Sequence, residues 1–288
     1  MIREYTAGRY HEAMLLETGA TAAVAARFDV ICAGEALAVW QGEAASTPLA
    51  LRPGGGAVNA ALALAHRGVR VALATILPDD RVGRALRKRI ADAGVDVRAV
   101  TLAAPRRSII LATSTGASSE VESHDSLDEP LVVPDRWSSA VLLVSGLTPI
   151  VADAAALVRA ARSARRRGAI VVVDVNARWK AWAGHDARAV RMILREADVV
   201  RASTRDLSTL NLDPIAMRAT SRPDSVLVVT NDAGDACASG TFGEVVVAGR
   251  PRSLREGDAF TAAVCAALAR AQDLRTDRAD VWHELLGG

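Results

Sequence analysis

Short apolar runs alternate with longer amphipathic stretches along most of the chain. The clearest run, residues 169–175, is almost uninterrupted and rich in β-branched side chains, which is typical of a strand buried on both faces of a parallel sheet. The other predicted strands are residues 29–33, 69–75, 140–145, 198–202 and 226–230. The predicted helices are residues 79–93, 151–167 and about 257–272. Because strands alternate with helices, we expect an α/β fold with a central, mostly parallel sheet and helices on both faces.

Two segments depart from this alternation. Residues 1–27 precede the first convincing strand and include a predicted helix over residues 11–27. Residues 97–133 contain short alternating runs, such as 108–113, with Ser, Gly and acidic residues between them. We therefore expect one large α/β domain over residues 28–288, preceded by an N-terminal extension.

Composition limits the class of protein further. The 288 residues are 50% hydrophobic, enough to bury a sizeable core, and 35 basic residues nearly balance 33 acidic ones. This balance argues against a strong positive field for nucleic acid. No apolar run is long enough to span a bilayer, so no membrane is expected. Three widely spaced cysteines, Cys32, Cys237 and Cys265, lie in apolar stretches and are expected to be reduced thiols, which predicts a cytoplasmic protein.

The candidate chemistry centres on residues 251–265. There a loop rich in charged and turn residues ends at Gly257 and Asp258, and an apolar run of small residues begins. If that run is a helix, its N-terminal N–H groups and its dipole favour an anion such as phosphate. Asp258 can then cap the helix, or it can accept a proton from a substrate hydroxyl. This stretch alone leaves both roles open.

A second glycine cluster, in the sequence PGGGAVNAALALAHRG, also opens a predicted helix, with Asn59 in its first turn. Together the two clusters resemble the motifs of the ribokinase-like (PfkB) family of carbohydrate kinases. Gly54, Gly55 and Asn59 match the GGxxxN motif of that family. The end of its DTxGAGD motif is matched by Gly257 and Asp258.

Three further segments resemble the 2-keto-3-deoxygluconate kinases and fructokinases of this family. Residues 34–37 read GEAL, residues 145–151 read SGLTPIV and residues 174–182 read DVNARWKAW. Val39 departs from the pattern, because many relatives carry an acidic residue there that binds sugar hydroxyls. The resemblance implies a ribokinase-like fold with a small β-lid formed by residues 37–51 and 97–133.

The resemblance also implies an ATP- and magnesium-dependent phosphotransferase that acts on a hydroxyl of a sugar or sugar acid. Asp258 would accept the hydroxyl proton. Backbone amides from Glu256 to Asp258, including that of Gly257, would stabilise the transferring phosphoryl group.

The substrate side of the implied site matches the family pattern better than the nucleotide side. Its residues are Gly54, Gly55, Asn59, Arg107, Asn176 and Arg178. Asp174, Asn176 and Arg178 follow a buried parallel strand, so we expect them to face the crevice where open α/β sheets bind ligands. A turn with a helix cap is the alternative for this trio, and a solvated turn is the alternative for Arg107.

The nucleotide side departs more from the family pattern. The implied nucleotide-binding residues are Ser203, Thr230, Asp232, Gly234 and Arg255, and Asp206 is the implied metal ligand. Asp232 replaces a glycine that approaches ATP, and one acid–phosphate pair at about 4 Å costs on the order of 4 kcal/mol unless the acid turns to solvent or a metal. Ser203 and Asp206 stand in place of the family's NxxE, and a helix cap explains them equally well. Arg255 replaces a glycine of the anion-binding loop.

Three functions remain open on these grounds, because a fold does not fix a function. The first is a sugar or sugar-acid kinase with a 2-keto-3-deoxygluconate-like substrate. The second is a kinase-derived protein that binds a sugar or a partner without transferring phosphate. The third is an enzyme of altered chemistry that uses Asp258 as an acid or base. The expected partners are a small sugar-like molecule and a second copy of the chain, which would form a homodimer through the open edge of the lid.

Overall fold

The computed structural model describes residues 25–42, 50–103, 109–113, 119–121, 131–146, 154–177, 188–249, 257–271 and 278–287. Within these ranges a nine-stranded sheet runs in the order β13-β12-β11-β10-β9-β8-β1-β4-β5. In chain order its strands are β1 (Ala26–Gly34), β4 (Val71–Pro78), β5 (Asp96–Ala103), β8 (Trp137–Ser145), β9 (Ile170–Asp174), β10 (Val199–Ser203), β11 (Val226–Thr230), β12 (Ala236–Gly240) and β13 (Gly243–Val247). Neighbouring strands are parallel from β5 to β11, and only β12 and β13 pair antiparallel. The predicted α/β class is confirmed.

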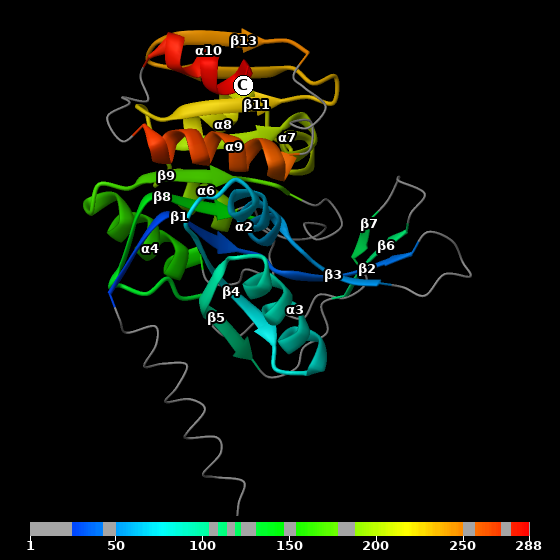
Figure 1. Cartoon of the computed structure of the whole chain (residues 1–288). Coiled ribbons are helices and arrows are strands. Elements are labelled where there is room, and N and C mark those ends of the chain that lie inside the picture. Colours follow the sequence, from blue (N-terminus) through cyan, green and yellow to red (C-terminus); the bar gives the residue numbers. More distant parts are fainter. Residues whose placement is uncertain are drawn as a thin grey trace, which may run out of the picture.

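Alternate side chains along each buried strand enter two separate hydrophobic cores. In β8, Val141 and Leu143 face one core, and Leu142 and Val144 face the other. The first core is covered by α2 (Gly56–His66), α3 (Arg81–Asp92), α9 (Gly257–Arg270) and α10 (Ala279–Gly287). The second is covered by α4 (Ala154–Arg166), α6 (Arg188–Leu194), α7 (Thr204–Thr209) and α8 (Pro214–Thr220). Helices therefore lie on both faces of the sheet, as Figure 1 shows.

A separate small sheet forms the predicted lid. It contains β2 (Leu37–Gly42), β3 (Ala50–Gly54), β6 (Ile109–Thr113) and β7 (Ser119–Val121), in the order β3-β2-β6-β7. Figure 1 shows these strands projecting from the body of the molecule. The predicted range 97–133 was too wide at both ends. Its first residues pair with β4 in the main sheet as part of β5, and Leu131 is buried in the second core.

The start of the domain also differs from the prediction. The helix expected over residues 11–27 lies mostly outside the described residues. Ala26 and Arg27 are the first residues of β1, where they pair with Trp137 and Ser138, so a helix cannot reach residue 27. These residues form a strand and not a helix because β1 pairs with β8 from its first residue to its last.

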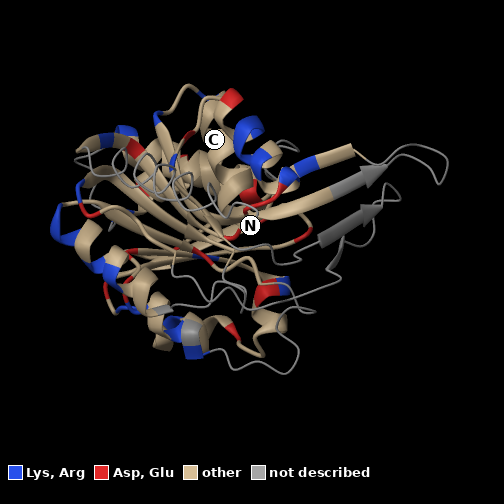
Figure 2. Ribbon diagram, turned by 90° about the horizontal axis from the view of Figure 1, so that it is seen from below, with Lys and Arg blue, Asp and Glu red and all other residues tan. Residues whose placement is uncertain are grey.

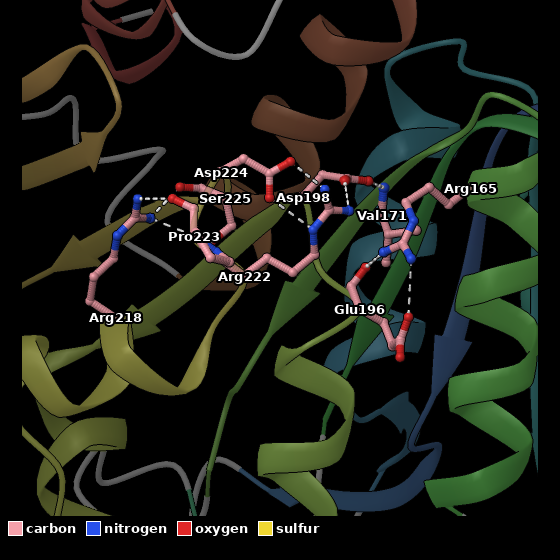
Figure 3. A network of polar contacts seen from close by, with 9 residues as sticks. All are labelled: Arg165, Val171, Glu196, Asp198, Arg218, Arg222, Pro223, Asp224 and Ser225. Carbon is pink, nitrogen blue, oxygen red and sulfur yellow. Dashed lines mark hydrogen bonds and ion pairs between the residues drawn. The ribbon is translucent and has the colours of Figure 1, made fainter.

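A polar network binds the amino ends of β9, β10 and β11 (Figure 3). Asp198 accepts the backbone N–H of Val171 through Oδ2 at 2.8 Å and pairs with Arg222 through Oδ1 at 2.8 Å. Next to it, Glu196 pairs with Arg165 at 3.3 Å. These contacts tie the amino ends of the three strands to one another and to α4.

Charge is otherwise spread over the molecule. Figure 2 shows basic and acidic positions on both sides of the main sheet, in keeping with 35 basic and 33 acidic residues in the sequence. Among the helices in the described ranges, none combines the length and the apolar character that crossing a bilayer requires.

Candidate active site

Two helices begin at the carboxyl edge of the parallel sheet. The first residue of α2, Gly56, lies so close to this edge that an added Cβ would be 2.5 Å from Ser145 Oγ and 2.6 Å from Asn176 Nδ2. The first residue of α9, Gly257, is equally close to Arg201 of β10. The amino ends of both helices therefore meet the carboxyl ends of β8, β9 and β10, which is where open α/β sheets bind ligands.

Asp258 lies at the centre of this edge. Asn59 of α2 donates through Nδ2 to Asp258 Oδ2 at 2.8 Å, and Asn176, just after β9, donates through Nδ2 to Asp258 Oδ1 at 2.8 Å. All three residues are partly exposed. Asn176 has φ 40°, a left-handed conformation that side-chain-bearing residues seldom adopt and that is enriched at functional sites. The structure thus brings together three predicted site residues that are up to 199 positions apart in sequence.

The predicted substrate-binding glycines form the wall beside this carboxylate. Gly55 has φ 96°, and a Cβ on it would lie 2.4 Å from the carbonyl oxygen of Glu35. A Cβ on Gly54 would lie 2.4 Å from Val39 Cγ2 of the lid strand β2. The two glycines thus allow the chain to pass between the end of β1 and the lid, and they set the position of the helix that carries Asn59.

A buried polar chain lies beneath the first turn of α9. Asp174, at the end of β9, is wholly buried and pairs with Arg201 of β10, with Nη1 3.1 Å from Oδ1. Thr261 of α9 donates through Oγ1 to Asp174 Oδ2 at 2.8 Å. Arg201 donates through Nη2 to Thr230 Oγ1 of β11 at 2.7 Å. The side chain of Asp174, which we expected to face the crevice, instead links β9 to β10 and to α9.

The buried charges of Asp174 and Arg201 affect each other's pKa. Burial raises the pKa of Asp174 to about 6, against the attraction of Arg201 and with the repulsion of Asp258 and Asp206. Burial alone would lower the pKa of Arg201, but the same three carboxylates raise it overall. The pKa of both groups is raised because Arg201 has three acids near it, whereas Asp174 is buried with one cation and two acids near it.

The raised pKa of Asp174 predicts a pH effect on stability. Since the ordinary pKa of this carboxyl is 3.8, folding takes up a proton at Asp174 between pH 3.8 and about pH 6. The free energy of unfolding is therefore highest below pH 3.8, and it falls by about 3 kcal/mol as pH rises through about 6.

The Asp174→Asn variant lacks this titration. Urea unfolding of both proteins from pH 4 to pH 8 should show the wild type losing about 3 kcal/mol relative to the variant. A difference that moves the other way would mean that the ion pair with Arg201 outweighs burial.

Asp206, the predicted metal ligand, forms a helix cap in this structure. Ser203 Oγ accepts the N–H of Asp206 at 3.1 Å, and Asp206 Oδ2 accepts the N–H of Ser203 at 2.6 Å, which completes a capping box at α7. Asp206 Oδ1 accepts the N–H of Ala177 at 2.6 Å. The capping alternative is thus supported. Across the described part of the chain, no group of three or more His, Cys, Asp or Glu side chains could hold a metal ion.

The loop after β11 leaves one of its two acids, Asp232, exposed to solvent. Asp232 is two-thirds exposed and pairs with Arg205 at 2.9 Å. Asp235 Oδ2 accepts from Asn231 Nδ2 at 2.9 Å, and Gly234 has φ 97° within the same tight turn. The repulsion that the sequence predicted between Asp232 and a triphosphate is thereby reduced, because this side chain points to solvent and has its own cation.

Some predicted site residues lie outside the described ranges, and two residues of the candidate site were not predicted from the sequence. The predicted residues outside the described ranges are Arg107, Arg178, Arg255 and Glu256. Arg201 and Thr261 were missed, although an Arg within the apolar run DVVRA was a usable signal. A strand buried on both faces can hold a charge only if that charge has a buried partner.

A family model and several solved structures match most of this chain. The family model of the pfkB family carbohydrate kinases matches residues 30–276. A search of curated proteins found no match. Among solved structures, aminoimidazole riboside kinase from Salmonella enterica, complexed with aminoimidazole riboside and an ATP analog, has a TM-score of 0.73 at 22% identity, covering 91% of this chain and 90% of that one.

Two fructokinases show the same likeness in fold. The enzyme from Xylella fastidiosa with bound ATP has a TM-score of 0.68 at 22% identity, covering 90% of this chain and 85% of its own. The enzyme from Vibrio cholerae O395, in a form with fructose, ADP and calcium ion, has a TM-score of 0.70 at 20% identity, covering 91% and 89%. The ribokinase-like fold is therefore confirmed. Because the family model spans most of the chain, this protein belongs to the pfkB family of carbohydrate kinases.

Proposed function

We propose that this chain transfers a phosphoryl group from ATP to a hydroxyl of a sugar or sugar acid, and that Asp258 accepts the hydroxyl proton. The observation that carries the proposal is the pair of amides on Asp258, since Asn59 and Asn176 each donate at 2.8 Å to a different carboxylate oxygen. A carboxylate held from both sides has a fixed direction in front of α9, where an anion is favoured.

The residues of this chain would act mainly by positioning. A substrate hydroxyl entering beside Gly54 and Gly55 would donate its hydrogen bond to Asp258. The N–H groups of the first turn of α9 would donate to the transferring phosphoryl group as its charge shifts. Phosphoryl transfer needs little covalent chemistry from the protein, so this arrangement would supply most of the catalysis.

The described residues fit a nucleotide phosphate. Asp232 is paired with Arg205 and exposed, and the turn that contains Gly234 is closed by its own hydrogen bonds. Thr230, at the end of β11, is held by Arg201. Arg255, outside the described residues, remains a proposed phosphate contact.

Magnesium fits less directly. Both oxygens of Asp206 already accept hydrogen bonds from Ala177 and Ser203, so Asp206 would reach a cation only through its remaining acceptor positions or through water. Mg²⁺ is commonly bound by one or two carboxylates together with substrate phosphates, and when bound it neutralises phosphate charge. Asp206 remains the protein residue that we propose to bind Mg²⁺, directly or through water.

The wall of the proposed substrate site favours a substrate with few hydroxyl contacts toward the lid. Val39, which packs on Gly54, presents methyl groups where many relatives present an acid. A 2-keto-3-deoxygluconate-like acid agrees with this, with Arg107 and Arg178 as proposed partners of its carboxylate. A cytoplasmic homodimer paired through the lid belongs to the same proposal, because β3 and β7 are edge strands.

A panel of acceptors tests the proposal. Purified protein would be incubated with Mg·ATP and, separately, 2-keto-3-deoxygluconate, other sugar acids, fructose, ribose and aminoimidazole riboside, with ADP release followed by a coupled assay. We expect one chemical class to give ADP and a phosphorylated product in equal amounts, with sugar acids ahead of neutral sugars. If no compound raises ADP release above the rate without acceptor, the proposed function is wrong in its substrate class.

A further inference from the structure

Arg201 is a buried cation inside the main sheet. It lies in the middle of β10, where its neighbours in sequence are buried apolar residues, and its own side chain is only 9% exposed. Removing a guanidinium from water is costly unless nearby groups compensate. Three carboxylates, those of Asp174, Asp206 and Asp258, lie close enough to act on its charge. This residue is thus the centre of the charge arrangement under the candidate site.

The contacts of Arg201 reach both neighbouring strands and the helix that carries Asp258. It pairs with Asp174 of β9 at 3.1 Å and donates to Thr230 of β11 at 2.7 Å. Through Asp174 it is connected to Thr261, one turn beyond Asp258 in α9. The contact through Asp174 and Thr261 restricts how α9 can shift along the sheet, and a shift of this helix would move Asp258.

Gly257 touches the guanidinium directly. A Cβ added at Gly257 would lie 2.8 Å from Nη1, 3.0 Å from Nη2 and 3.2 Å from Cζ of Arg201. The φ of Gly257 is not in the left-handed region, so close packing on Arg201, and not backbone conformation, requires glycine here. The cation also lies beneath the positive end of the helix, an unfavourable arrangement that the carboxylates of Asp174, Asp206 and Asp258 offset.

We propose that Arg201 is a positioning residue for phosphoryl transfer: it supports the first turn of α9 through Gly257 and so fixes the direction of the Asp258 carboxylate. The inference deepens the proposed function and rests on it for the role of Asp258. Arg201 itself makes no direct contact with the substrate in the proposed role. It acts through Gly257, Asp174 and Thr230.

A double-substitution cycle on stability tests the packing. Gly257→Ala in the wild type should lower the Tm by about 5 °C, because the new methyl group meets the guanidinium. In the Arg201→Gln background the space is open, and the same change should lower the Tm by less than about 2 °C or raise it, since Ala favours helix. Equal shifts in the two backgrounds would overturn the contact. If Arg201→Gln does not fold, Arg201→Lys, with its slimmer head group, takes its place.

Positioning is tested on the unliganded protein by nitrogen-15 NMR. The side-chain amides of Asn59 and Asn176 report the position of Asp258, to which both donate. We expect their resonances to move in Arg201→Gln and to move less in Arg201→Lys. They should stay in place in Arg70→Gln, which breaks an exposed Arg–Asp pair at the other edge of the sheet. Unchanged amide resonances in Arg201→Gln would reduce Arg201 to a structural role.

Turnover separates this inference from the proposed function. With Mg·ATP and the best acceptor of the panel, Arg201→Gln should lower kcat about 100-fold with the acceptor KM changed less than about threefold, and Arg201→Lys should recover about tenfold. A loss confined to KM would contradict the inference. If the wild type phosphorylates nothing, the proposed function fails, whereas the NMR result still decides whether Arg201 positions Asp258.

Discussion

Replacing Asp258 by Asn is expected to lower kcat by about 10²–10⁴-fold, because the variant cannot accept the proton of the substrate hydroxyl. The substitution keeps the size of the side chain. Its NH₂ group would, however, face the Nδ2 group of either Asn59 or Asn176, so one of these amides must turn over. Binding of the acceptor, measured by calorimetry, should change little. Initial rates of ADP release at saturating acceptor measure the loss.

Asp280→Asn is the matched control for this experiment. Asp280 occupies the second position of α10, as Asp258 does in α9, but it is exposed and pairs with Arg278. Loss of a first-turn acid from a helix is common to both variants, so Asp280→Asn should keep wild-type turnover. Unchanged turnover in Asp258→Asn would contradict the assignment of the proton acceptor, and an equal loss in the control would attribute the effect to the protein as a whole.

Replacing Gly55 by Ala should be among the most destabilising single changes at the site. Its φ of 96° and ψ of 147° lie in a region essentially restricted to glycine, which alone costs about 1–3 kcal/mol for Ala. The new Cβ would also lie 2.4 Å from the Glu35 carbonyl oxygen. Such a backbone contact cannot be relieved by rotating a side chain. We expect the free energy of unfolding to fall by about 3–5 kcal/mol in urea titrations.

Gly68→Ala separates the two causes. Gly68 also has a positive φ, 73°, but a Cβ added there meets no atom within 4 Å. Its substitution should therefore cost only the conformational strain, about 1–2 kcal/mol. Equal losses for the two variants would show that close packing around Gly55 contributes nothing. A smaller loss for Gly55→Ala would contradict the geometry of the glycine loop.

The sequence was most informative where a residue type has few physical explanations. Glycine followed by Asn59 at a helix start, and Gly257 with Asp258 at another, predicted two amino-terminal helix ends. The alternation of strands and helices predicted a mostly parallel sheet with helices on both faces. The structure brings Asn59 and Asp258 within 2.8 Å of each other. The family model, which matches residues 30–276, confirms the carbohydrate kinase family.

The sequence was least informative where the decisive contact is tertiary. Nothing near Asp206 in sequence distinguishes a capping acid from a metal ligand, and only the N–H groups of Ser203 and Ala177 reveal how its oxygens are engaged. Arg201 stands out as a charge in an apolar run, but its partners cannot be named from the sequence because they come from β9 and β11. The limits of the lid were missed because short alternating runs do not reveal which sheet a strand joins. β5 joined the main sheet by pairing with β4.

We expect ATP to bind in front of α9, beside the Asp258 carboxylate that Asn59 and Asn176 hold. Isothermal titration calorimetry of the wild-type protein with magnesium and a non-hydrolysable ATP analogue tests this most directly, since it needs no knowledge of the acceptor. We expect saturable binding with a micromolar Kd. Absence of binding heat at millimolar nucleotide would rule out this nucleotide site, because an exposed Asp232 paired with Arg205 and the amino end of α9 should together accept a triphosphate.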